Sequence, residues 1–165
     1  MQWISLVGTA LGALIAMVAT TVNERSKWRR EQASTRRKLC QDTYSRFLAA
    51  LTDAHERMRM ASRTGFANDE ADEARATAIL DVFRDGRCYE ARYEIALVAG
   101  QAVLDHSERC FQILRDIRDT FAAGSDIHST EYDALRQSYR THLRELQVAM
   151  RVDLGAESVD LSGGS

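Results

Sequence analysis

The chain has 165 residues and a net charge of −2, with 45% hydrophobic and 28% charged residues. This composition excludes a wholly disordered chain, and the length suits one domain with an appendage. The three cysteines are odd in number and widely spaced, which argues against the disulfide framework of a small secreted domain. Because the sequence contains no proline, long unbroken helices and an all-α fold are expected.

The N-terminal segment predicts a transmembrane anchor over residues 1–22. Residues 3–22 carry no charge, and a helix of this length spans about 30 Å, the thickness of a hydrocarbon core. Trp3 lies at the edge of the stretch, where aromatic side chains favour the membrane interface. A cleaved signal peptide is the alternative. It fits less well, because Met1 and Gln2 provide no basic side chain and a basic segment follows the apolar stretch.

Small residues recur at intervals of four within the predicted anchor, at Gly8, Gly12 and Ala16. This spacing lets two helix backbones approach closely in lipid, and it predicts a homodimer. The alternative is a chance pattern, since glycine and alanine are common in membrane helices.

Residues 23–38 predict a basic juxtamembrane stalk. The segment has a net charge of +5, which leaves −7 on the residues after Lys38. Basic residues next to an anchor predict a cytoplasmic flank, so we expect the N-terminus outside and the C-terminal domain in the cytoplasm, at the inner (plasma) membrane. We expect contact with anionic lipids and, without a supporting motif, no nucleic-acid binding. The basic side chains are Arg25, Lys27, Arg29, Arg30, Arg36, Arg37 and Lys38.

The first helix is predicted to continue through the stalk to about Arg63, where Gly65 suits a helix end. Its apolar residues are spaced alternately by four and three, which is a heptad-like pattern for packing against other helices. They are Cys40, Tyr44, Phe47, Leu51, Ala54, Met58 and Ala61.

The second helix is predicted over residues 70–98 as one element. Ile79, Phe83, Tyr93 and Leu97 would mark its packed face. The alternative is a turn at Asp85-Gly86 that splits the element in two.

Two further helices are predicted, over about 101–123 and 129–153. Ser129 suits an N-cap, and Gly155 suits the C′ position just after the helix. With short turns, the four helices predict an antiparallel, coiled-coil-like four-helix bundle over residues 39–154, followed by a disordered tail at 155–165. Their apolar seams are Val103, Ser107, Cys110, Leu114, Ile117 and Phe121, then Tyr132, Leu135, Tyr139, Leu143, Leu146 and Met150.

Histidines and cysteines are the candidate reactive side chains. His106 and Cys110 lie one turn apart, as do His142 and Glu145, but a zinc site needs three or four ligands. The sequence contains no glycine-rich phosphate loop, no G-x-S-x-G motif and no C-x-x-C motif. We therefore expect no metal, no cofactor and no enzymatic activity. The histidines would face solvent or lie at the boundary of the core, and the cysteines would be small core residues.

The uncharged anchor is followed by residues 28–30 (WRR), 44–48 (YSRFL), 91–97 (ARYEIAL) and 150–155 (MRVDLG). This combination resembles small uncharacterised bacterial single-pass membrane proteins with a cytoplasmic helical bundle. The resemblance implies this architecture and assigns no activity, because no function is established for those proteins.

The expected function is a membrane-anchored interaction module that binds the lipid bilayer and a protein partner, as a scaffold, sensor or regulatory protein. Two alternatives are a structural membrane protein that self-associates through its anchor and an effector that acts on the membrane itself.

Overall fold

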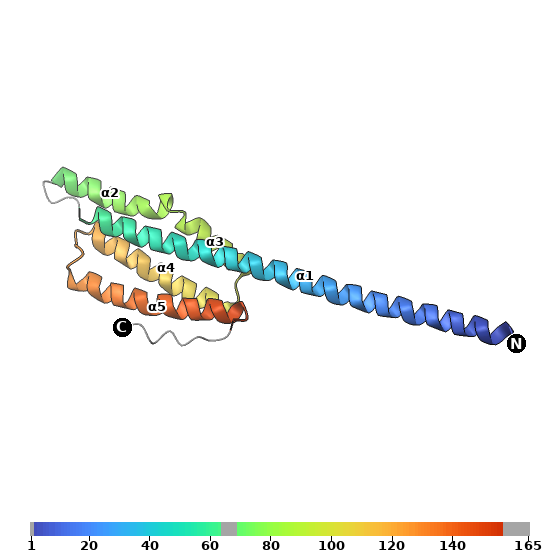
Figure 1. The fold of residues 1–165 in the computed structure, drawn as a ribbon. Coiled ribbons are helices and arrows are strands. Elements are labelled where there is room, and N and C mark those ends of the chain that lie inside the picture. The colour runs from blue at the N-terminus through green and yellow to red at the C-terminus, as the bar shows by residue number, and fades with distance from the viewer. Residues whose placement is uncertain (1, 64–68, 157–165) are drawn as a thin grey trace. The chain divides into compact units, whose positions relative to one another are not determined.

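The computed structural model of the chain describes the backbone of residues 2–63 and 69–156, and the side chains of residues 27–63 and 70–156. The described backbone forms helices and no strand, which confirms the all-α prediction (Figure 1). The helices are α1 (Gln2–Ala61), α2 (Asp69–Asp85), α3 (Cys88–Val98), α4 (Gln101–Ala122) and α5 (Thr130–Asp153).

Helix α1 runs without a break because the chain has no proline and no glycine between Gly12 and Gly65. The chain divides into two compact units, Met1–Leu39 and Cys40–Ser165. In the first unit, the side chains of residues 27–39 are all exposed, as the polar sequence of this segment favours.

The second unit is an antiparallel helical bundle in which α2 and α3 together occupy one of four positions. At one end, the Cys40 thiol of α1 lies 3.7 Å from the carbonyl oxygen of Val98, at the end of α3. At the same end, the Tyr44 hydroxyl donates a hydrogen bond to Asp153 Oδ2 at the end of α5 (2.6 Å). Helices α4 and α5 lie side by side, and α2 packs on α4 (Figure 1).

Apolar seams from all five helices meet in one continuous core. The seam predicted for α4 is buried at every position, and the seam of α1 is buried from Cys40 to Met58. In α5, Leu135 and Leu143 are partly buried and pack against the core. The fully buried large side chains include Phe47, Leu51, Met58, Ile79, Phe83, Ile95, Leu114, Ile117, Phe121, Tyr132 and Leu146.

The prediction of a single helix over residues 70–98 is wrong, because α2 ends at Asp85 and α3 begins at Cys88. Arg87 adopts a left-handed backbone conformation with φ 57°. Gly86 is needed just before it, since a Cβ there would lie 2.7 Å from the Val82 carbonyl oxygen.

Because of this break, α3 turns other positions toward the core than an unbroken helix over residues 70–98 would. The residues that face the core are therefore Cys88, Ala91 and Ile95. Tyr93 and Leu97, which were predicted to pack, are instead 65% and 86% exposed.

Both predicted caps of α5 are confirmed. The Ser129 hydroxyl accepts a hydrogen bond from the Tyr132 backbone N–H (3.2 Å), which satisfies one free donor of the first turn. Gly155 follows the helix with φ 68°, a conformation that glycine adopts at little cost. The predicted helix end at Gly65 and the tail from residue 157 lie outside the residues described in full.

Among the described residues, no helix is long and apolar enough to cross a membrane. The predicted anchor falls where side chains are not described, and with it lie Gly8, Gly12, Ala16 and Arg25.

Candidate metal centre and adjoining groove

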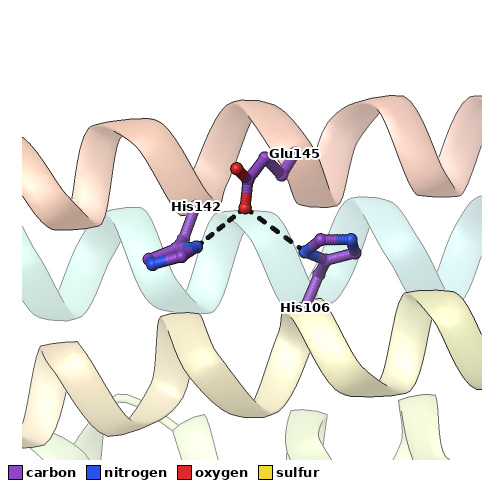
Figure 2. Close-up of side chains that lie close together, drawn as sticks. All are labelled: His106, His142 and Glu145. Carbon is purple, nitrogen blue, oxygen red and sulfur yellow. Dashed lines mark hydrogen bonds and ion pairs between the residues drawn. The ribbon is translucent and has the colours of Figure 1, made fainter.

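The packing of α4 against α5 brings three potential metal ligands together. On α4, His106 lies next to the buried seam residue Ser107, so it is half-buried at the edge of the interface. On α5, His142 and Glu145 are separated by three positions, which places them on one face of the helix. Figure 2 shows both imidazoles directed toward the Glu145 carboxylate.

One carboxylate oxygen is shared by the two histidines. The Nδ1 atom of His142 lies 2.8 Å from Glu145 Oε2, which is hydrogen-bond distance. The Nδ1 atom of His106 lies 3.5 Å from the same oxygen. One ligand atom from each residue falls within 4.8 Å of the other two (Figure 2).

The His106 Nδ1 atom is buried, and among the described residues it finds no hydrogen-bond partner. The 3.5 Å contact with the Glu145 carboxylate compensates only in part for the hydration that this buried nitrogen loses. The side chains of the three residues keep 26–44% of their surface exposed. The three side chains are therefore partly accessible to solvent, whereas the Nδ1 atom of His106 is not.

A groove of about 700 Å³ between α4 and α5 adjoins this cluster, and His106 and Glu145 belong to its wall. Most of the wall is apolar, and Gln101, Arg144 and Asp153 add polar groups. The apolar residues of the wall are Ala102, Val103, Val148, Ala149 and Val152.

The cysteines have the role that the sequence predicts. All three are reduced and buried. Burial raises the pKa of Cys88 to about 11, and burial together with the Glu145 carboxylate raises the pKa of Cys110 to about 12. Thiols held in this protonated form are poor nucleophiles, so they act as small core side chains.

Sequence spacing finds the His142–Glu145 pair, but it pairs His106 with Cys110 and not with these two residues. The position of His106 opposite Glu145 could have been inferred from the expected register of the α4–α5 hairpin. His106 and Glu145 lie almost equally far along the chain from Asp126, which belongs to the connecting loop. Two antiparallel helices joined by a short loop bring such positions to the same level.

The predicted lipid-contact residues that the structure describes are exposed on α1 and do not take part in this cluster. They are Lys27, Arg29, Arg30, Arg36, Arg37 and Lys38.

Comparison with known proteins adds no assignment: no protein-family model, no curated protein and no solved structure matches the chain.

Proposed function

We propose that the chain is a membrane-tethered cytoplasmic helical bundle that acts as an interaction module and binds an amphipathic helix of a partner protein. The observation that carries the proposal is the groove between α4 and α5. Its wall follows α5 over residues 144–153, which corresponds to about 14 Å of helix. An elongated apolar groove between two helices is the usual receptor for the apolar face of a third helix.

The groove exposes apolar surface where a partner would cover it. Val148 and Val152 lie one turn apart on α5 and are both exposed, and Ala149 stands beside them. Isolated apolar residues are common on protein surfaces, but a contiguous apolar groove with a polar border is typical of interaction sites. Because the residues after Lys38 carry a net charge of −7, the polar face of the partner helix should be basic.

The tether rests on the sequence of the N-terminal segment. Residues 3–22 contain no charge and are long enough to cross a bilayer as a helix. The basic side chains that follow would set the orientation, with the bundle in the cytoplasm.

The tether predicts that the chain stays with membranes after washing with carbonate and high salt. A reporter fused to the C-terminus should be active only in the cytoplasm. The matched variant replaces both Leu11 and Leu14 with arginine, which opposes insertion by about 5–7 kcal/mol in total. Release of the parent chain, or equal retention of parent and variant, would contradict the tether.

The groove predicts that a photo-reactive amino acid at Val148 forms one discrete adduct with a partner protein in cells. Leu80 on α2 is the control position, because it has similar exposure (48% against 40%) and does not line the groove. The substitution Val152→Asp should lower the adduct yield at position 148 at least tenfold, since it places a charge against an apolar face.

Three results would count against the groove. They are no adduct at position 148, equal yields at positions 148 and 80, or an adduct with a second copy of this chain, which would favour the self-association alternative.

A further inference from the structure

We infer that His106, His142 and Glu145 bind a divalent transition-metal ion of the zinc class. This site is additional to the proposed docking of a partner and does not depend on it. Two imidazole nitrogens and one carboxylate oxygen are a ligand set that zinc accepts in proteins. Three such atoms from two packed helices lie within 4.8 Å of one another.

The spacing of the ligand atoms suits an ion after small side-chain movements. Ligand atoms around a tetrahedral zinc ion lie about 3.4 Å apart, given bonds of about 2.1 Å. The His106 Nδ1 and Glu145 Oε2 atoms already have this spacing, at 3.5 Å. The hydrogen-bonded pair of His142 and Glu145, at 2.8 Å, needs to open by about half an ångström.

A simple ion pair accounts for only part of the arrangement. His142 and Glu145 would form a hydrogen bond on α5 without any metal, because residues three apart on a helix are neighbours. The ion pair of His106 with the same oxygen is longer, at 3.5 Å, and leaves the buried Nδ1 atom without a hydrogen bond. A cation bound between the three atoms would give that nitrogen a direct ligand bond and would balance the carboxylate charge.

Three protein ligands leave one coordination position of a four-coordinate ion open. His106 and Glu145 also belong to the wall of the groove between α4 and α5. A water molecule, or a donor group of a molecule bound in the groove, would complete the coordination. The half-exposed side chains let the ion enter and leave, so we expect an exchangeable ion.

The test uses the full chain in detergent, purified without a polyhistidine tag and stripped with a chelator. Zn²⁺ is titrated by calorimetry, and Co²⁺ is followed by visible absorption, which reports four-coordinate geometry. One ion should bind per chain. His106→Gln and Glu145→Gln should each weaken Zn²⁺ binding by about 100-fold or more, because loss of an outer-shell partner alone costs 10- to 100-fold.

Two controls separate this site from other metal ligands in the chain. His128→Gln removes an exposed histidine of the loop between α4 and α5, outside the cluster, and should leave the affinity unchanged. Cys110→Ala removes a buried thiol one turn from His106 and should also leave it unchanged, since its sulfur is not among the three ligand atoms.

Helical ellipticity and the melting temperature of each metal-free variant show whether it folds. Zn²⁺ should raise the melting temperature of the parent chain but not that of His106→Gln, because only a folded site binds the ion. Absence of saturable binding, equal affinity of the parent and His106→Gln, or loss of binding in Cys110→Ala would each overturn the assignment.

Discussion

Replacing Phe121 with alanine should lower the free energy of unfolding of the bundle by about 3–5 kcal/mol, the usual cost of removing a buried aromatic ring. The Phe121 side chain is fully buried at the end of α4. Its ring centroid lies 4.7 Å from that of Tyr132 on α5, so the ring also joins the two helices by an aromatic contact. The cavity left by the substitution can close only if the backbones of α4 and α5 move.

The matched control for this substitution is Leu97→Ala on α3. Leu97 is 86% exposed, so we expect a change within about 0.5 kcal/mol. Urea unfolding of the full chain in detergent, followed by helical ellipticity and by labelling of the three buried cysteines, measures both values. A large loss of stability in Leu97→Ala, or a small one in Phe121→Ala, would contradict the packing of the bundle.

Phe121 and Leu97 show what sequence periodicity can and cannot predict. In α4 the apolar spacing keeps one phase from Val103 to Phe121, so the seam follows directly from the sequence. At residues 86–87 the chain leaves the helix, and Arg87 takes a left-handed conformation. If the apolar spacing of Ile79 and Phe83 is continued across that turn, it predicts the wrong buried face for α3.

The candidate metal centre depends on information that periodicity does not contain. The His142–Glu145 pair is visible as neighbours on one helix. The position of His106 opposite them depends on the register of α4 on α5 and on the rotation of each helix. Large buried side chains such as Phe121 and Leu146 determine the register and the rotation through their packing. Tertiary packing, rather than local spacing, therefore assembles the cluster.

Lowering the pH from 7 to 4.5 should destabilise the bundle through proton uptake by His55, which the folded state disfavours. His55 of α1 packs against Tyr139 of α5, with ring centroids 5.2 Å apart, and its Nε2 atom lies 3.3 Å from the Tyr132 hydroxyl. Burial lowers the pKa of His55 from 6.5 to about 4. The Glu56 carboxylate opposes this shift, and the guanidinium groups of Arg59, Arg136 and Arg140 add to it.

The direction of the effect follows from proton uptake. Between pH 6.5 and about 4 the unfolded chain binds a proton at His55 that the folded chain does not bind, so stability rises with pH across this window. The contribution is complete above pH 6.5 and is lost as the pH falls toward 4. The pKa difference corresponds to about 3 kcal/mol, and partial exposure of the ring reduces the expected value to about 2 kcal/mol.

The variant His55→Gln isolates this contribution, because glutamine does not titrate and can still form a hydrogen bond with the Tyr132 hydroxyl. The free energy of unfolding of each protein is measured by urea titration at pH 7 and pH 4.5. The decrease should be smaller in His55→Gln than in the parent chain by about 2 kcal/mol. Groups other than His55 contribute equally to the parent chain and to His55→Gln, so they cancel in the comparison. If His55→Gln loses as much stability on acidification as the parent chain does, His55 is not held neutral between α1 and α5.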